Sequence, residues 1–270
     1  MYKNLMKLVF NLQGFPINEA IKELKSLVFL NRKEVLEHQE TKKWEIFNFH
    51  LNNNSFYAKL LVGKNINDWS EIPIMTKSDF QSPIIDLLSK GYNKKNIYSH
   101  NTSGSSGHPF TFAKDKYCHA LCWAMIQDRF RWHGIDNGKD LQARFYGMPK
   151  SFKLNLIEKI KDFILNRFRF DVFDFSVKGL ENIISTFKKK PFVYVNGYTN
   201  TLVLLANYCL ENNINIKKIC PSLKVVFVTS EMCDDIDRKK ITSAFGVDVV
   251  NEYGASELDL ISFEDNNGDL

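Results

Sequence analysis

The spacing of apolar residues predicts alternating strands and helices in the second half of the chain. Strands are expected at residues 141–146, 168–172, 192–195, 223–228 and 247–250, and helices at residues 116–132, 153–166, 176–188, 199–211 and 234–245. Runs such as Val225-Val226-Phe227-Val228 are apolar at every position, which is typical of a parallel sheet covered by helices on both faces. The pattern therefore predicts an α/β fold with a mostly parallel sheet.

The first part of the chain reads as a helical and irregular lead-in. Residues 17–30 place apolar side chains on one helical face, and Asn18 is the expected N-cap. Residues 34–61, rich in Asn and aromatic residues, carry no pattern that assigns them. Farther along, Pro73 blocks a continuous helix, and Thr76 or Ser78 is placed to cap a short new one.

A loop of small, hydroxyl-bearing and turn-forming residues occupies positions 101–109, with the sequence Asn-Thr-Ser-Gly-Ser-Ser-Gly-His-Pro. Its amides and hydroxyls can converge on an anion without interference from large side chains. Residues 97–100 and 110–113 alternate at period two, so the loop should join two strands. A P-loop runs from strand into helix and ends in Gly-Lys-Ser/Thr, whereas His108 follows Gly107 here. By composition alone, a phosphate-binding loop and a flexible turn both fit.

Polar segments follow three of the expected strands: Asn-Gly-Tyr at 196–198, Thr-Ser-Glu at 229–231 and Asn-Glu-Tyr-Gly-Ala-Ser-Glu at 251–257. Ligands of parallel sheets bind outside the carboxyl ends of strands. The third segment offers an aromatic ring for stacking, a glycine for close approach, a hydroxyl and a carboxylate that can hold Mg²⁺ beside phosphates. For Glu231, stabilisation of a helix dipole is an equal alternative, and Tyr253 also fits a wedge against the sheet.

Composition narrows the class of protein. The chain has 270 residues, of which 44% are hydrophobic and 25% charged, so it can bury a substantial core. Its net charge of +5 is scattered, and we find no nucleic-acid-binding motif. Five cysteines without a Cys-x-x-Cys pair indicate buried thiols in a reducing compartment. No signal peptide or membrane span is expected, and the predicted location is cytoplasmic.

Taken together, residues 69–257 resemble the adenylate-forming enzymes, particularly the branch of phenylacetate-CoA ligases and CapK-like proteins of capsular polysaccharide synthesis. The resemblance depends on Thr-Ser-Gly-Ser-Ser-Gly-His-Pro at 102–109 followed by Tyr-Gly-Ala-Ser-Glu at 253–257. An upstream segment with Ile72-Pro73 and Thr76-Lys77, and the segment 229–231 between the two motifs, add to it. It implies a large domain of the adenylate-forming type, with a lead-in over residues 1–95 and a nucleotide-binding α/β core over 96–270.

The resemblance also implies roles for matching residues. The β- and γ-phosphates of ATP would be held by Thr102, Ser103, Gly104, Ser105, Ser106 and Gly107. The adenine would be contacted by Ser230, Glu231, Tyr253 and Gly254. The acyl pocket would be bordered by Asn196, Gly197 and Tyr198. Ser256 would approach the α-phosphate, Glu257 would bind Mg²⁺, and these two with Thr102 are the catalytic candidates.

The implied reaction joins a small-molecule carboxylic acid to ATP. The carboxylate attacks the α-phosphorus, an acyl-adenylate and pyrophosphate form, and the acyl group then passes to a thiol such as coenzyme A. Because the carboxylate is already the nucleophile, catalysis would consist mostly of alignment and charge neutralisation. The resemblance names neither the acid nor the acceptor, and the oligomeric state is open.

Two departures from the family pattern bear on activity. His108 stands where the family often has Lys, which would weaken the hold on the triphosphate. After Glu257 we find no counterpart of the family's ribose-binding Asp, hinge and small carboxyl-terminal domain with its Lys. We therefore expect the amino-terminal part of a ligase. A non-catalytic relative that binds nucleotide or acyl group is the alternative, and a P-loop phosphotransferase is disfavoured by His108.

Overall fold

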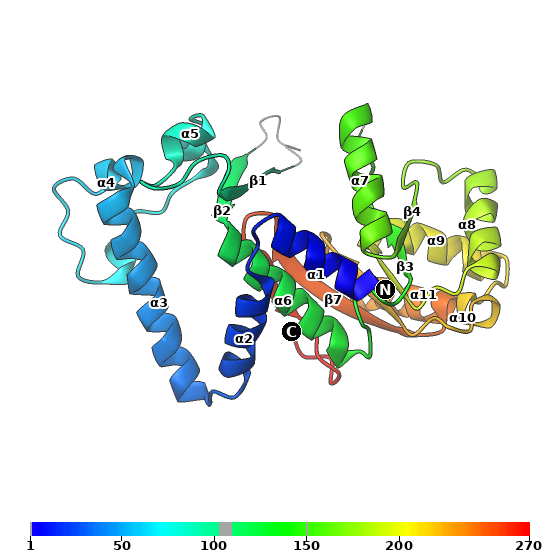
Figure 1. Ribbon diagram of the computed structural model, residues 1–270. Coiled ribbons are helices and arrows are strands. Elements are labelled where there is room, and N and C mark those ends of the chain that lie inside the picture. Colours follow the sequence, from blue (N-terminus) through cyan, green and yellow to red (C-terminus); the bar gives the residue numbers. More distant parts are fainter. Residues whose placement is uncertain (1, 103–109, 150) are drawn as a thin grey trace. The chain divides into compact units, whose positions relative to one another are not determined.

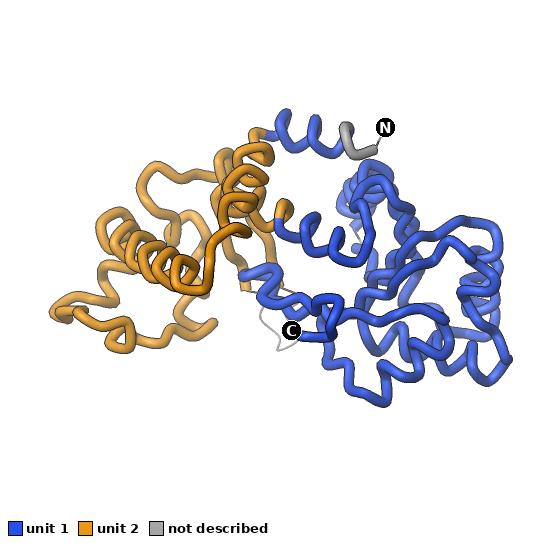
Figure 2. Tube along the Cα trace, turned by 90° about the horizontal axis from the view of Figure 1, so that it is seen from below, with its two compact units in different colours: residues 1–13, 125–270 blue, residues 14–124 orange. Residues whose placement is uncertain are grey.

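The computed structural model describes residues 2–102, 110–149 and 151–270 (Figure 1). The chain divides into two compact units, which we call unit 1 (residues 1–13 and 125–270) and unit 2 (residues 14–124) (Figure 2). Helix α6 (Lys116–Trp132) begins in unit 2 and ends in unit 1. The functional division expected near residue 95 stays a prediction.

Unit 1 contains a six-stranded sheet with the strand order β4-β3-β5-β6-β7-β8. Its strands are β3 (Gln142–Phe145), β4 (Arg167–Phe170), β5 (Tyr194–Tyr198), β6 (Val225–Thr229), β7 (Asp248–Ala255) and β8 (Asp259–Phe263). All neighbours pair in parallel except β7 and β8, which form an antiparallel hairpin. The expected α/β fold with a mostly parallel sheet is confirmed, and β8 is a strand that the sequence pattern did not predict.

Helices alternate with these strands as the hydrophobic periodicity predicted. They are α7 (Phe152–Ile164), α8 (Val177–Lys189), α9 (Thr199–Glu211), the short α10 (Ile216–Ile219) and α11 (Asp235–Phe245), with α1 (Tyr2–Leu12) at the start of the unit. Local chemistry sets their ends. The Asp234 carboxylate accepts a hydrogen bond from the Asp237 N–H at 2.8 Å, and Gly246 ends α11 with a left-handed φ of 70°.

The two faces of the sheet differ in chemistry. One face packs on α8, α9 and α11 and forms the larger apolar core, which includes Phe145, Val195, Val226, Leu205 and Phe245. On the opposite face, β6 and β7 also contribute apolar side chains, which pack around Phe130 of α6. Polar residues occupy that second face on β3 and β5, where each parallel strand presents alternate side chains.

Two expected strands end later than the sequence indicated. Segment 196–198 was expected after its strand but lies within β5, and Tyr253 and Gly254 lie within β7. The pattern misplaced these ends because polar residues and glycines in the segments broke the apolar runs. Pairing with β6 carries β5 through Tyr198, and pairing with β8 carries β7 through Ala255.

Unit 2 is mostly helical before its β-hairpin. Its longer helices are α2 (Ile17–Val28) and α3 (Arg32–Asn53), and its shorter elements are α4 (Ser55–Leu60), η1 (Trp69–Glu71), η2 (Lys77–Phe80) and α5 (Ile84–Leu87). One sequence expectation was wrong here, and one segment without an assignment proved helical. Helix α2 begins directly after Pro16, so Asn18 is not its N-cap. Most of the unassigned segment 34–61 is helical, because Asn31 and Glu34 form a capping box that starts α3.

Other expectations for unit 2 are confirmed. Thr76 is the N-cap of η2, and its N–H donates to the Asp79 carboxylate at 2.5 Å. Strands β1 (Ile97–Asn101) and β2 (Thr111–Asp115) pair in an antiparallel hairpin. Asp115 caps α6 by accepting the Cys118 N–H at 2.6 Å.

The side chain of Cys118 is exposed, contrary to the burial expected for every cysteine.

We expect Gly197→Ala to destabilise unit 1 by about 1–3 kcal/mol through overpacking. A Cβ at Gly197 would lie 2.6 Å from the Cβ of Phe145 and 3.1 Å from its carbonyl oxygen, so two adjacent strands would have to separate. Denaturant unfolding of the whole chain measures the loss. Gly147→Ala is the matched control, because its new Cβ would meet Phe173 at an ordinary 3.5 Å. Equal stability of the two variants would contradict the packing argument.

Candidate functional site

The three polar segments predicted from the sequence meet at one edge of the sheet. Strands β5, β6 and β7 are neighbours, and the residues at their carboxyl ends pair in register, Tyr198 with Thr229 and Thr229 with Glu252. Segments 196–198, 229–231 and 251–257 are therefore adjacent in unit 1. This is the edge at which parallel sheets bind ligands, so it is the candidate functional site.

Asn196 connects two strands that are not neighbours. Its side chain is buried, and its Nδ2 donates to Oε2 of Glu252 at 2.7 Å, across the intervening strand β6. Its Oδ1 accepts from Nε2 of Gln142 at 3.3 Å and from Nη1 of Arg144 at 3.5 Å. The predicted acyl-pocket residue thus belongs to a polar layer that the sequence analysis did not identify.

Three arginines extend this layer on the outer strands. Arg144 lies on β3 and Arg167 and Arg169 lie on β4, with Arg144 directly opposite Arg169. In the sequences Gln-Ala-Arg-Phe and Arg-Phe-Arg-Phe, polar and apolar residues alternate at period two, which is the signal that could have located the layer. The analysis of strand ends overlooked it because these residues lie inside strands.

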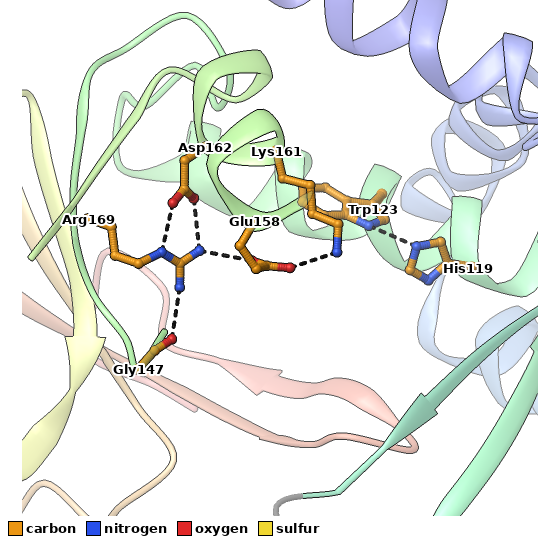
Figure 3. Close-up of polar contacts among 7 residues, drawn as sticks. All are labelled: His119, Trp123, Gly147, Glu158, Lys161, Asp162 and Arg169. Carbon is orange, nitrogen blue, oxygen red and sulfur yellow. Dashed lines mark hydrogen bonds and ion pairs between the residues drawn. The ribbon is translucent and has the colours of Figure 1, made fainter. Parts of the chain in front are cut away.

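Arg169 is fully compensated by carboxylates of α7 (Figure 3). Its guanidinium donates to both oxygens of Asp162, at 2.7 and 2.9 Å, and to Oε2 of Glu158 at 3.0 Å. A further Nη1 hydrogen bond reaches the Gly147 carbonyl at 3.2 Å. The side chains of Arg169 and Asp162 are only 7% and 9% exposed, so this bidentate pair fixes α7 against β4 with both charges matched.

Two tyrosines lie beside Arg144 where β3 and β5 end. The Arg144 guanidinium carbon lies 3.7 Å from the ring centroid of Tyr146, and the ring of Tyr146 lies 4.7 Å from that of Tyr198. Burial raises the pKa of the Tyr146 phenol well above its ordinary value, so the hydroxyl is a neutral hydrogen-bonding group. Tyr198, a predicted acyl-pocket residue, therefore lies next to an aromatic ring that covers a cation.

Glu252 is the carboxyl that faces this cationic layer from β7. Burial raises its pKa from the ordinary 4.5 to about 7, against the opposing effects of the Asn196 hydrogen bond and of Arg144 and Arg167. Desolvation of the charged form therefore outweighs these favourable partners. The carboxyl titrates near neutral pH.

The turn after β6 contacts the start of α9. Oε2 of Glu231 accepts the Asn200 N–H at 2.7 Å, and the Thr199 hydroxyl donates to the Glu231 carbonyl at 2.9 Å. Ser230 has a φ of 72°, which is uncommon for a residue other than glycine. The carboxylate of Glu231 thus stabilises a helix terminus, which was the alternative to a ligand contact in the sequence analysis. The helix that it stabilises is α9. The adenine-contacting roles of Ser230 and Glu231 stay predictions.

The motif at 253–257 lies on the β7–β8 hairpin. Tyr253 is 61% exposed, and residues 256–258 form the turn, where Ser256 and Glu257 are exposed. A Cβ at position 254 would lie 2.3 Å from the Asp259 carbonyl oxygen. The close pairing of β7 with β8 is therefore enough to require glycine at this position. Within the described ranges, no group of three or more His, Cys, Asp or Glu side chains is arranged to hold a metal ion. The Mg²⁺ role of Glu257 stays a prediction.

Thr102 directly follows β1 of the hairpin in unit 2. Its N–H donates to the Phe110 carbonyl at 2.9 Å, and its hydroxyl accepts the Phe110 N–H at 2.9 Å, which closes the hairpin on both sides. The other predicted phosphate-binding residues lie outside the described residues; they are Ser103, Gly104, Ser105, Ser106 and Gly107. Their predicted role is unchanged.

Unit 2 also encloses a cavity of about 810 Å³. Its walls come from α3, η2, α5 and the β1–β2 hairpin and include Phe49, Phe80 and Leu87. His50 lines it and contacts Oγ of Ser89 at 3.1 Å, and burial lowers the pKa of the imidazole. Elsewhere in this unit, Nε1 of Trp123 donates to Nε2 of His119 at 3.2 Å (Figure 3). Among the described residues, no predicted site residue lines the cavity.

Comparisons with known proteins agree with the fold. No protein-family model matches the sequence. Protein CapK of Staphylococcus aureus is 24% identical over 262 residues, covering 93% of this chain and 56% of CapK. An open conformation of 2-hydroxyisobutyryl-CoA ligase in complex with 2-HIB-AMP and CoA has a TM-score of 0.60 at 15% identity, covering 85% of this chain and 56% of the ligase.

The same ligase in its thioesterification state, also with 2-HIB-AMP and CoA, has a TM-score of 0.56 at 16% identity and covers 80% of this chain and 48% of the ligase. The chain spans about half the length of these relatives. The expected resemblance to the adenylate-forming enzymes and to CapK is confirmed. Among helices of the described ranges, none has the length and apolar character needed to cross a bilayer.

We expect Arg169→Met to lower the free energy of unfolding by about 3–5 kcal/mol, because it leaves Asp162 buried without its counter-charge. Denaturant unfolding of the purified chain tests this. Lys161→Met is the control: Lys161 also pairs with Glu158, at 2.8 Å, but is 56% exposed, so its loss should cost no more than about 1 kcal/mol. Comparable losses in both variants would show that burial of the Arg169 pair is not decisive.

We expect Glu252→Gln to remove part of the pH dependence of stability. The folded-state pKa of about 7 lies above the ordinary 4.5, so the folded protein binds the extra proton between these values. The stability that this bound proton contributes is complete below pH 4.5 and is lost as the pH rises through 7. Between pH 5 and pH 8, wild type should therefore lose about 2 kcal/mol of unfolding free energy that the variant does not lose. A difference that is constant across this range would contradict the raised pKa.

Proposed function

We propose that this chain, which has the fold of the adenylate-forming enzymes and resembles CapK in sequence, belongs to an ATP-dependent ligase that activates a carboxylic acid. The observation that carries the proposal is the adjacency of segments 196–198, 229–231 and 251–257 at the carboxyl ends of three neighbouring parallel strands. These segments are spread over the second half of the sequence, and only the fold brings them together. The edge of the sheet at which they meet is the one at which ligands of parallel sheets bind.

In the proposed reaction the carboxylate of the acid attacks the α-phosphorus of ATP and expels pyrophosphate. The exposed ring of Tyr253 would stack on the adenine, and Ser256 in the adjoining turn would approach the α-phosphate. Tyr253 is anchored in β7 by its pairing with Ser262 of β8, which holds the ring on a rigid element. Thr102 and the residues after it would bind the outer phosphates.

Glu257 is the residue that would hold Mg²⁺. A single exposed carboxylate suits this ion, because Mg²⁺ usually keeps several waters and shares one or two carboxylates with substrate phosphates. The ion would supply neutralisation of the charge on the phosphates. The remaining work of the chain is alignment of the two reactants, since the carboxylate needs no base to become a nucleophile.

Coenzyme A is the proposed acyl acceptor. The 2-hydroxyisobutyryl-CoA ligase of the same fold was solved in complex with 2-HIB-AMP and CoA. The likeness to CapK supports capsular polysaccharide synthesis as the setting. A cytoplasmic location belongs to the same proposal, because none of the five cysteines, all within the described residues, forms a disulfide, as in a reducing compartment.

A relative that binds nucleotide without turnover is the second candidate. The observation that favours it is the engagement of Glu231, whose carboxylate already accepts the Asn200 N–H at 2.7 Å. A carboxylate committed to a helix terminus contributes less to a bound base, which favours a non-catalytic relative that retains acyl binding. Binding and pyrophosphate release, measured separately, distinguish the two candidates.

We expect isothermal titration of the chain with Mg·ATP to show binding that Glu257→Ala weakens at least about tenfold, the equivalent of about 1.4 kcal/mol. The physical reason is loss of the carboxylate that holds the ion beside the phosphates. Glu181→Ala, which removes an exposed carboxylate from α8, should bind as wild type does. Circular dichroism confirms that both variants fold.

Unchanged binding by Glu257→Ala would remove the Mg²⁺ assignment, and no binding by the folded wild type would count against the nucleotide site itself. Acid-dependent release of pyrophosphate from ATP identifies the ligase. Nucleotide binding without that release, for every acid tried, identifies the non-catalytic relative.

A further inference from the structure

We propose that Arg144 binds a second carboxylate of the acid substrate, so that the acid activated here is a dicarboxylic acid. This inference rests on the proposed function, because it places the acid beside segment 196–198. Arg144 pairs directly with Asn196 across β3 and β5, and its guanidinium lies over Tyr146, next to Tyr198. It is therefore the cation nearest to the proposed acyl pocket along these two strands.

The charges around Arg144 do not balance. Arg169, directly opposite on β4, has Asp162 and Glu158 as counter-charges. Within the described ranges, by contrast, no carboxylate oxygen lies within 4.0 Å of the Arg144 guanidinium, whose polar contact is the 3.5 Å hydrogen bond to Asn196. A partly buried guanidinium is stable when an anion accompanies it and costly when none does.

Glu252 does not make up the difference. It is the carboxyl that faces Arg144 and Arg167 from β7, but its Oε2 already accepts from Asn196. Burial also raises its pKa to about 7, so near neutral pH the carboxyl carries only part of a negative charge. Among the described residues, Glu158 of α7 also acts on Arg144, but it is paired with Arg169 and Lys161, so Arg144 has no carboxylate of its own.

The hydrogen-bonding groups of the layer also fit an added polar ligand. Nε of Arg144 is buried without a partner among the described residues, and the same holds for Oε1 of Gln142 and the hydroxyl of Tyr194. The four residues Gln142, Arg144, Tyr194 and Asn196 are mutual neighbours on two rungs of the β3–β5 pair. With one face covered by Tyr146, the guanidinium still offers the donors along its edge, which match a carboxylate in bidentate geometry.

An acid with a hydrocarbon end fits this layer poorly. It would displace water from Arg144 and supply no anion in return, which disfavours binding of a purely apolar acyl group. A second carboxylate at the far end of the acid would instead complete the charge of the layer. The reacting carboxylate would remain toward the carboxyl edge of the strands, where the predicted nucleotide-binding segments lie.

Matched acids of equal chain length test the inference. Butyrate and succinate, hexanoate and adipate, and octanoate and suberate each differ by one carboxylate. Isothermal titration of the folded chain with each acid measures binding, and pyrophosphate release with Mg·ATP measures activation. For at least one pair we expect wild type to favour the diacid by about tenfold or more, in Kd and in kcat/KM.

Variants of Arg144 assign the preference to this side chain. Arg144→Met should abolish the diacid preference by weakening diacid binding, while the matched monoacid binds as well as it does to wild type or more tightly. Arg144→Lys keeps the charge but not the bidentate fork, so it should retain part of the preference, and it remains informative if the Met variant does not fold. The Kd for Mg·ATP should be the same in wild type and in both variants.

Several results would overturn the inference. The first is that wild type prefers monoacids. The second is that Arg144→Met loses the same affinity for both acids of a pair. The third is that wild type binds the diacid of none of the pairs. If monoacids support pyrophosphate release and diacids do not, the inference fails while the ligase function stands. If no acid supports release and Mg·ATP does not bind, the proposed function fails instead, and calorimetry with the acids alone still decides whether Arg144 binds a carboxylate.

Discussion

The need to compensate charge buried against a parallel sheet governs the structure of unit 1. One face of the sheet meets this constraint by being apolar throughout its contact with α8, α9 and α11. The other face carries arginines on β3 and β4, and there Arg169 is matched by two carboxylates of α7. Because Asp162 is nearly as buried as Arg169, neither charge is stable without the other, and α7 is held against β4.

The same constraint applied to Arg144 connects structure to function. Arg169 has its anions within the fold, whereas among the described residues Arg144 has no ion pair and has a 3.5 Å hydrogen bond to Asn196. An unbalanced polar layer costs stability, and proteins keep such layers at sites where a ligand completes them. Through Asn196, which accepts from Arg144, the layer reaches the segment of β5 that lies at the carboxyl edge of the sheet.

Several residues that were predicted to contact a ligand also have structural roles. Gly197 and Gly254 are required by strand pairing, since a Cβ at either position would collide with the neighbouring strand. Glu231 stabilises the start of α9. Such duties are compatible with a binding site at strand ends, because the backbone that presents a ligand-binding residue must itself be packed and hydrogen-bonded. They also show why residue type alone does not separate the two roles.

The sequence by itself determined the alternation of elements from residue 141 onward, the β-hairpin around Thr102 and the location of the strand-end segments. Apolar periodicity, caps and turn residues act locally, and they are legible in a linear chain. Only the tertiary structure decided the order of the strands, the pairing of β8 with β7 and the polar layer around Arg144. Hydrogen bonds and charge compensation between residues distant in sequence create these features, and no local pattern encodes which partner a buried arginine will have.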